Sequence, residues 1–362
     1  MGQVEKNIVK IATNNKSAWS IRVGGHLLAL LIFVLVSTAV NAQAEETPEW
    51  LPGLLEKESI TIVITDSGLG GLAVLADAAE KFRQHPVFKQ VNLVFFNALF
   101  TDKSGYNGLQ TREEKLEVFS SALQSMEDIY APDIILVACN TLSVLIPDTE
   151  FARTSSVPVV GIVADGVEQI AEQLRGKPSA RNIIFATQTT VDEGMHKDFL
   201  LEQGFADEQI MTQSCPQLTL HIEQGYDSEY TEMLIDAYVD EALSRAGDIE
   251  GPISVSFNCT HFGYSMEFWK LAFNSRGVEV TAFLDPNTQM IDFLLPASLQ
   301  QRYPKSEVIV KVVSMIDIPA DRQDSIGRWL HTVSPVTETA LRNFELKPDL
   351  FEWQGLNAGT VK

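Results

Sequence analysis

The stretch Ser59–Gly71, S-I-T-I-V-I-T-D-S-G-L-G-G, decides the fold class of this chain. Its first seven residues form an almost unbroken apolar and β-branched run, which predicts a strand buried on both faces. A glycine-rich turn follows, and the apolar spacing of Ala73–Phe82 predicts a helix directly after the turn. A strand, a tight turn and a helix in this order indicate the first unit of an α/β sheet.

The same alternation continues along the chain. Further strands are predicted at Val91–Phe96, Asp133–Ala138, Val157–Val163, Asn182–Ala186, Ile253–Phe257, Val278–Leu284 and Glu307–Met315. Helices are predicted at Thr111–Tyr130, Gly166–Leu174, Val191–Gln203, Asp227–Ala246, Asp324–Leu330 and Thr337–Phe344. Near-continuous apolar strands separated by helices predict mainly parallel sheets covered by helices on both faces.

Composition limits the function classes. The chain has 362 residues, of which 45% are hydrophobic and 21% charged, as in globular proteins. Its net charge of −21 argues against a nucleic-acid partner, because phosphate binding needs a basic face. Acidity of this size mainly favours solubility.

Residues 1–44 have the pattern of a signal peptide. Four basic residues precede the uncharged apolar run Leu27–Val40, and Ala42-Gln43-Ala44 fits the small-x-small cleavage pattern before Glu45. The run is short for a bilayer, which needs about 20 residues. We therefore expect a periplasmic or secreted protein, and an uncleaved membrane anchor is the alternative interpretation.

The turn Asp66-Ser67-Gly68-Leu69-Gly70-Gly71 is the first candidate site. Glycines let a ligand approach the backbone, and the following helix presents free N–H groups to an anion. The spacing also satisfies a loose dinucleotide fingerprint, but Asp66 would lie beside the pyrophosphate, and the next strand ends at Phe96-Asn97 without a ribose-binding acid. A carboxylate or small-anion site is the preferred interpretation, and a purely structural turn stays open.

Two cysteines follow apolar strands in similar settings. Cys139 precedes Asn140-Thr141, and Cys259 precedes Thr260-His261. A single cysteine after a strand is usually a buried apolar residue, and Cys215, which precedes a proline, is interpreted in that way. Ligands collect at the carboxyl ends of parallel strands, so two thiols with polar neighbours there indicate a site. The cysteines and histidines lack the close spacing of common metal sites, so no metal is expected.

Two such thiols suit the removal and return of a proton on opposite faces of a carbon atom. The α-proton of an amino acid is a very weak acid, so the base must be an activated thiolate, and donors must hold the carboxylate. Asp66 and His261 are the candidates in these motifs that could assist a thiol.

Together these motifs resemble the aspartate/glutamate racemase superfamily, and glutamate racemase in particular. The resemblance covers about residues 58–290, in the family's order, through the glycine turn with Leu72-Ala73-Val74, both cysteine motifs, Pro158-Val159-Val160-Gly161, Ala186-Thr187-Gln188-Thr189-Thr190-Val191, Cys215-Pro216 with Glu223, and Leu284-Asp285-Pro286. It implies two similar α/β lobes with the active site in the cleft between them. Residues 58–160, joined by 286–362, would form lobe 1, and residues 161–285 would form lobe 2.

The resemblance also implies roles for individual residues and no cofactor. Cys139 would handle the α-proton of the D-enantiomer and Cys259 that of the L-enantiomer. Asp66, Glu223 and His261 match positions that assist the thiols. Positions that hold the substrate are matched by Ser67, Asn140, Thr141, Thr190 and Thr260, and more loosely by Tyr106 in Gly105-Tyr106-Asn107-Gly108.

Some residues depart from the family's pattern. Glu193 and His196 stand where small Ser and Tyr residues are usual, and Phe262-Gly263 replaces Tyr-Pro. These changes leave the proton chemistry intact and bear on substrate choice, so glutamate is expected first and aspartate or another acidic substrate second. A decarboxylase or cis–trans isomerase of the superfamily and a non-catalytic periplasmic amino-acid-binding protein are the alternatives, although paired thiols favour racemisation. A homodimer stays open, because nothing in the sequence decides the oligomeric state.

Overall fold

The computed structural model describes residues 48–101, 105–247 and 251–354. The predicted signal peptide, residues 1–44, lies outside the described residues. From Gly53 onward the described chain forms one compact unit. Within these ranges no helix combines the length and the apolar character that crossing a membrane requires.

Ten described strands form two sheets in which every neighbouring pair is parallel. The first sheet has the order β10-β9-β2-β1-β3-β4 and the second has the order β6-β5-β7-β8. The strands of the first sheet are β1 (Ser59–Asp66), β2 (Gln90–Asn97), β3 (Ile134–Val137), β4 (Val159–Gly161), β9 (Glu307–Ser314) and β10 (Glu345–Leu346). Those of the second are β5 (Arg181–Ala186), β6 (Ile210–Ser214), β7 (Ile253–Asn258) and β8 (Val280–Leu284).

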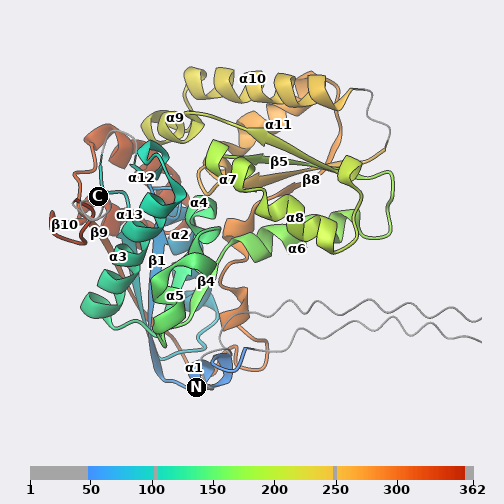
Figure 1. The fold of residues 1–362 in the computed structure, drawn as a ribbon. Coiled ribbons are helices and arrows are strands. Elements are labelled where there is room, and N and C mark those ends of the chain that lie inside the picture. The colour runs from blue at the N-terminus through green and yellow to red at the C-terminus, as the bar shows by residue number, and fades with distance from the viewer. Residues whose placement is uncertain (1–47, 102–104, 248–250, 355–362) are drawn as a thin grey trace, which may run out of the picture. The chain divides into compact units, whose positions relative to one another are not determined.

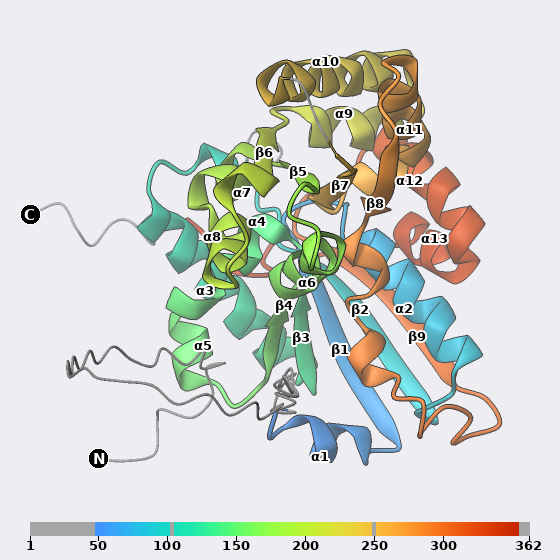
Figure 2. The ribbon, with the colours of Figure 1, turned by 90° about the vertical axis from the view of Figure 1, so that its right-hand side faces the viewer.

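Helices flank both sheets. They are α1 (Leu51–Leu55), α2 (Leu72–Gln84), α3 (Arg112–Tyr130), α4 (Asn140–Ser143), α5 (Glu150–Thr154), α6 (Val163–Leu174), α7 (Gln188–Glu193), α8 (Met195–Glu202), α9 (Leu218–Gly225), α10 (Glu229–Ala246), α11 (Met266–Ser275), α12 (Ala320–Val333) and α13 (Pro335–Arg342). Figure 1 shows α10 and α11 on one side of β5 and β8, and α6 and α8 on the other. In Figure 2, β9, β2, β1, β3 and β4 lie side by side, with α2 and α13 toward β9 and α3 and α5 toward β4. The predicted α/β class is confirmed.

The central strands are buried on both faces, which explains their continuous apolar sequence. Ile62, Val63 and Ile64 of β1 are fully buried, as is all of β3. Each fully buried Val or Ile side chain contributes about 1.5–3 kcal/mol to folding. These strands therefore hold Asp66 and Cys139, at or just beyond their carboxyl ends, in fixed positions.

Strands of the first sheet come from residues 59–161 and 307–346, and those of the second from residues 181–284. The chain therefore returns to the first sheet after completing the second. The lobe boundaries given above, 58–160 with 286–362 and 161–285, stay a prediction.

Several element boundaries differ from the sequence-based prediction. The helix expected at 191–203 is divided into α7 and α8, because Gly194 adopts a left-handed backbone with φ +67°. The strand expected at 157–163 is limited to β4, and Val163 begins α6 instead. Two strands were not predicted: β6, in whose sequence IMTQS three of the five residues are polar, and the two-residue β10. Both lie at sheet edges, where packing demands a less continuous apolar pattern.

Candidate active site

The carboxyl ends of the two sheets meet, and hydrogen bonds cross from one to the other. Thr260, which follows β7, donates to Oδ2 of Asp66 at 2.7 Å. In the turn after β1, the backbone N–H of Leu69 donates to Oε1 of Glu223 on α9 at 2.9 Å. Segments far apart in sequence are thereby brought into one site, and each thiol predicted to be catalytic belongs to it.

Cys139 lies at the N-terminus of α4, directly after β3, and is 5% exposed. Its Sγ is 3.1 Å from Oγ of Ser67. Burial and the neighbouring charge of Asp66 raise the pKa of the Cys139 thiol, and hydrogen bonding to Ser67 offsets only part of that shift. In this closed arrangement Cys139 is held as a protonated thiol, which suits a proton donor.

The carboxyl group of Asp66 is itself buried. Burial raises its pKa, and the charge of His261 together with hydrogen bonds from Thr260 and Cys139 partly offsets the shift. Asp66 thus touches the surroundings of both thiols, since it contacts Cys139 and accepts from Thr260, the residue next to Cys259.

Cys259 has a different environment. Its Sγ lies 3.8 Å from Nδ1 of His261, whose Nε2 is 2.9 Å from Oε1 of Glu223. The other oxygen of Glu223 accepts a hydrogen bond from Nη1 of Arg322 at 3.1 Å. A thiol, an imidazole, a carboxylate and a guanidinium are therefore connected in a row.

The charges in this row stabilise one another. Burial alone would lower the pKa of His261, but the hydrogen bonds and charges of Cys259 and Glu223 raise it well above its ordinary value. For Glu223 burial acts in the opposite direction, and the contacts with His261, Leu69 and Arg322 prevail and lower its pKa. His261 is therefore held as a cation and Glu223 as an anion, and the cation lies beside the sulfur of Cys259.

Three threonine hydroxyls form a cluster that includes Thr141, two residues after Cys139. Oγ1 of Thr141 lies 3.0 Å from that of Thr187 and 3.2 Å from that of Thr190, and the last two are 3.0 Å apart. Thr141 follows β3 and the other two follow β5, so the cluster again joins the two sheets. Hydroxyl groups can turn their protons toward a carboxylate, so the cluster can hold one.

Asn140 contributes a further polar group. Its Oδ1 is 3.0 Å from Nε2 of His196, whereas its buried Nδ2 has no partner among the described residues. The same is true of both polar atoms of Asn258 and of the hydroxyl of Tyr106. Burial, with a smaller effect of the charge of Cys139, raises the pKa of Tyr106 well above its usual value. Buried donors without a protein partner are expected where a ligand supplies the missing hydrogen bond.

The glycine turn lies very close to the Cys259 side. A Cβ atom at Gly70 would lie 2.2 Å from Oγ1 of Thr260 and 2.5 Å from Nδ1 of His261. Gly70 is not among the residues with positive φ, so close approach, and not backbone conformation, requires glycine here.

The departures from the family's pattern are not equally close to the site. Phe262 is fully buried, with its ring 5.6 Å from that of Trp269, and a Cβ at Gly263 would lie 2.2 Å from Oδ2 of Asp285. Glu193 pairs with Arg112. Of the four substituted residues, His196 is the one with a hydrogen bond to a predicted substrate-binding residue.

Three site residues were missed from the sequence. Thr187 lies in the motif Ala186-Thr187-Gln188-Thr189-Thr190-Val191 and is the N-cap of α7. A threonine directly before a helix was a usable signal. Asn258 directly precedes Cys259 in the strand-end segment Asn258-Cys259-Thr260-His261, which was a usable signal. Arg322 gave no signal, since a helical arginine has many other uses. Cys215 is buried, and its Sγ makes a weak contact with O of Gln213 at 3.9 Å; burial and, to a smaller extent, the charge of Cys259 raise the pKa of its thiol. Its structural role stays a prediction.

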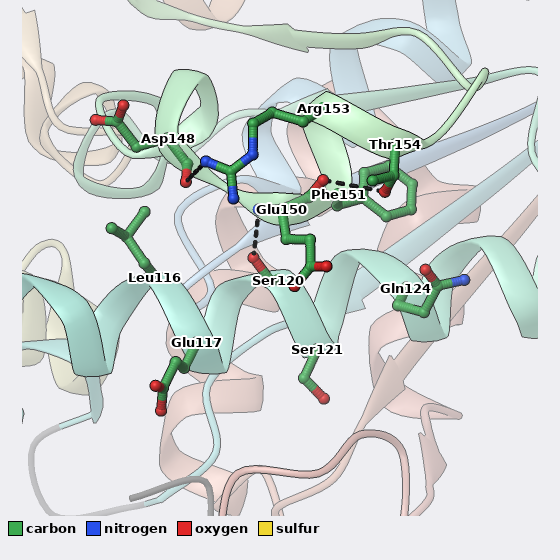
Figure 3. Close-up of a pocket in the computed structure, with 10 residues that line it drawn as sticks. All are labelled: Leu116, Glu117, Ser120, Ser121, Gln124, Asp148, Glu150, Phe151, Arg153 and Thr154. Carbon is green, nitrogen blue, oxygen red and sulfur yellow. Dashed lines mark hydrogen bonds between the residues drawn. The ribbon is translucent and has the colours of Figure 1, made fainter. Parts of the chain in front are cut away.

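Both catalytic candidates are nearly closed off from solvent, since Cys139 and Cys259 are each 5% exposed. A surface hollow of about 470 Å³ lies elsewhere, between α3 and α5. Figure 3 shows that Glu117, Asp148, Glu150 and Arg153 surround it, and none of the predicted site residues does. In the described ranges no group of three or more His, Cys, Asp or Glu side chains is placed to hold a metal ion.

Comparisons with known proteins show which family and which enzymes this chain is similar to. The model of the Asp/Glu/Hydantoin racemase family matches residues 73–251. Glutamate racemase of Aquifex pyrophilus is 28% identical over 202 residues, which cover 56% of this chain and 70% of that protein. Glutamate racemase of Campylobacter concisus (strain 13826) is 25% identical over 231 residues, covering 64% of this chain and 77% of that protein. These relatives confirm the resemblance to glutamate racemase.

Solved structures agree on the fold. Glutamate racemase of Campylobacter jejuni subsp. jejuni aligns with a TM-score of 0.56 at 20% identity, covering 75% of this chain and 98% of that one. Glutamate racemase of Francisella tularensis subsp. tularensis SCHU S4, in complex with D-glutamate, also aligns with a TM-score of 0.56, at 18% identity, covering 76% and 95%. At these identities the likeness is one of fold.

Proposed function

We propose that the protein is an isomerase that racemises an acidic amino acid, with glutamate as the first substrate, by proton transfer between Cys139, Cys259 and the α-carbon. The observation that carries the proposal is that both strand-end thiols belong to one buried site, joined by the hydrogen bond from Thr260 to Asp66. Similarity to glutamate racemases supports the choice of substrate.

In the proposed reaction the two thiols act in turn. With the L-enantiomer, the Cys259 thiolate takes the α-proton, and the electron pair of the C–H bond stays on a planar carbanion conjugated with the carboxylate. The Cys139 thiol then delivers its proton to the opposite face. The turnover leaves Cys259 as a thiol and Cys139 as a thiolate, which is the form that accepts the D-enantiomer in the reverse direction.

The electrostatics favour one starting form. The raised pKa of Cys139 keeps its proton in place, and protonated His261 puts a positive charge beside the sulfur of Cys259. The closed structure is thus prepared for the L-enantiomer. After turnover in that direction a proton must return to Cys139, and the hydroxyl of Ser67 lies 3.1 Å from its sulfur.

The polar groups of the substrate have matching partners. The hydroxyls of Thr141, Thr187 and Thr190, with Nδ2 of Asn140, supply donors for the α-carboxylate, where negative charge develops. Asp66 and Ser67 suit the amino group, since both can accept a hydrogen bond.

Isotope exchange in deuterated water tests the proposal. Wild type should incorporate α-deuterium into both enantiomers of glutamate, measured by proton NMR, and should invert them, measured by circular dichroism. Cys139→Ala should retain exchange of the L-enantiomer alone, and Cys259→Ala that of the D-enantiomer alone, both without inversion. Cys215→Ala is the matched control, because this buried thiol has no hydrogen bond to Cys139 or Cys259 among the described residues and its loss should leave both measurements unchanged.

Two outcomes would refute the mechanism or the function. If either single variant still inverted glutamate, two-thiol transfer would be wrong. If wild type exchanged neither glutamate nor aspartate, the racemase proposal would fail, and binding of these amino acids without turnover would favour a binding protein.

Export from the cytoplasm is a separate proposal that rests on the sequence of residues 1–44. It predicts that the protein recovered from the periplasm or the medium begins at Glu45, as N-terminal sequencing would measure. Recovery of membrane-bound protein that retains residues 1–44 would favour the anchor instead.

A further inference from the structure

Arg322 connects α12 to the Cys259 side of the site. It lies near the start of this helix, and its Nη1 donates to Oε2 of Glu223 on α9 at 3.1 Å. Both side chains are largely buried, with 16% of Arg322 and 7% of Glu223 exposed. The helix begins well beyond residue 251, where the match to the racemase family ends.

The two oxygens of Glu223 have separate partners. Oε1 accepts from the N–H of Leu69 and faces Nε2 of His261, both at 2.9 Å, while Oε2 accepts from Arg322. The carboxylate is therefore fixed in orientation from both sides, and His261 in turn is directed with Nδ1 toward Sγ of Cys259 at 3.8 Å.

We propose that Arg322 is a positioning residue for the Cys259 half of the reaction, which orients Glu223 and compensates its charge so that the pair of Cys259 thiolate and His261 cation persists. The inference rests on the proposed racemase function. Arg322 acts through Glu223 and His261 and is not assigned a contact with the substrate.

The charge balance of the buried row gives the physical reason. With Arg322 present, thiolate, imidazolium, carboxylate and guanidinium alternate in sign and sum to zero. Without Arg322 the remaining three carry one net negative charge in a buried place, which is strongly unfavourable. Proton uptake removes this net negative charge in one of two ways. Protonation of Cys259 removes the base, and protonation of Glu223 removes the counterion of His261. Both routes make the Cys259 thiolate scarcer.

The other thiol has no direct contact with this row among the described residues and is coupled to it indirectly, through Asp66, whose carboxyl interacts with the charge of His261. The groups next to Cys139 are the hydroxyl of Ser67 and the carboxyl of Asp66. Removing Arg322 should therefore change the reactivity of Cys259 and leave that of Cys139 nearly unaltered. This selective effect separates a positioning role from a purely structural one.

The experiment compares Arg322→Gln and Arg322→Lys with wild type. Arg328→Gln is the matched control, because Arg328 lies on the same helix and forms a bidentate ion pair with Asp227 at 2.6 and 2.8 Å. Both of these side chains are about half exposed. Two quantities are measured: kcat/KM for both enantiomers of glutamate, and the ratio of the alkylation rates of Cys259 and Cys139 by iodoacetamide, followed by peptide mass spectrometry. A change in how often the closed site opens would alter both alkylation rates alike, so their ratio would not change.

Arg322→Gln should lower kcat/KM roughly 10- to 100-fold. The loss must be equal in both directions, because the two enantiomers have equal free energies. The alkylation ratio should fall by about 10-fold or more, Arg322→Lys should recover a good part of both, and Arg328→Gln should change neither by more than about twofold.

The proposal is overturned if Arg322→Gln keeps the wild-type alkylation ratio, or if Arg328→Gln lowers it equally. It is also overturned if Arg322→Lys recovers nothing although the variant melts like wild type. Absence of α-deuterium exchange in wild type would refute the racemase function alone, since alkylation needs no turnover and still decides the role of Arg322.

Discussion

Replacing Gly70 by alanine should strongly slow the reaction while leaving the protein folded. The added Cβ would lie 2.2 Å from Oγ1 of Thr260 and 2.5 Å from Nδ1 of His261, whereas ordinary contacts begin near 3.4 Å. These two side chains must therefore move by about 1 Å. His261 lies beside the Cys259 sulfur, so the shift disturbs the geometry of proton transfer directly.

The size of the effect follows from that displacement. A misplacement of about 1 Å in a catalytic group can cost roughly 100-fold in rate, which corresponds to about 2.7 kcal/mol in activation free energy. Overpacking costs the fold about 1–3 kcal/mol, a small enough loss for the native state to persist. We expect kcat/KM for glutamate to fall about 100-fold and the melting temperature by several degrees.

The assay follows inversion of glutamate by circular dichroism, with a thermal melt of the same sample to verify folding. Gly53→Ala is the control, because a Cβ at that helical glycine meets no described atom within 4 Å. It should keep full activity. If Gly70→Ala were folded and kept more than about a third of wild-type kcat/KM, the close approach of the turn to His261 would not constrain the reaction, and the reasoning would be refuted.

Two further predictions concern pH and stability. Burial raises the pKa of Asp285 from 3.8 to about 7, so the native state loses stability as the pH rises through this range. The variant Asp285→Asn still accepts a hydrogen bond from the N–H of Asn287, and it should raise the free energy of unfolding by up to about 4 kcal/mol at pH 8 and hardly at pH 4. Urea titrations at both pH values would measure this, and an equal gain at both would exclude ionisation as the cause. Burial lowers the pKa of His196 from 6.5 to about 4, so the contribution of His196 to stability is complete above pH 6.5 and is lost as the pH falls toward 4. Between pH 6.5 and 4.5 the free energy of unfolding of wild type should therefore fall by about 2–3 kcal/mol more than that of His196→Gln. Equal losses in the two proteins would contradict this.

The sequence was most informative where local pattern and burial agree. β1, β3 and β7 are buried on both faces, so their apolar runs identified them, and the thiols follow the last two of these strands. Parallel pairing then requires their carboxyl ends to share an edge, which made a site there predictable.

Other features depend on contacts that a local pattern does not contain. The division between α7 and α8 depends on the left-handed backbone of Gly194, because glycine inside an apolar periodic stretch is compatible with either outcome. Arg322 looks like any arginine on the polar side of a helix, and its role arises from Glu223, 99 residues earlier in the chain. Its position could not be inferred without the packing of α12 on α9.

The insertion of β9 between β2 and β10 has a consequence for how the chain reaches its native state. β2 pairs with β9 along its whole length, from Gln90 with Glu307 to Asn97 with Ser314. Until residue 314 has been synthesised, the apolar β2 presents an open edge that can pair with other chains. Contacts of such long sequence separation slow folding. We therefore expect nascent or truncated chains that end before residue 307 to aggregate and to depend on chaperones, although every predicted catalytic residue is already present in them.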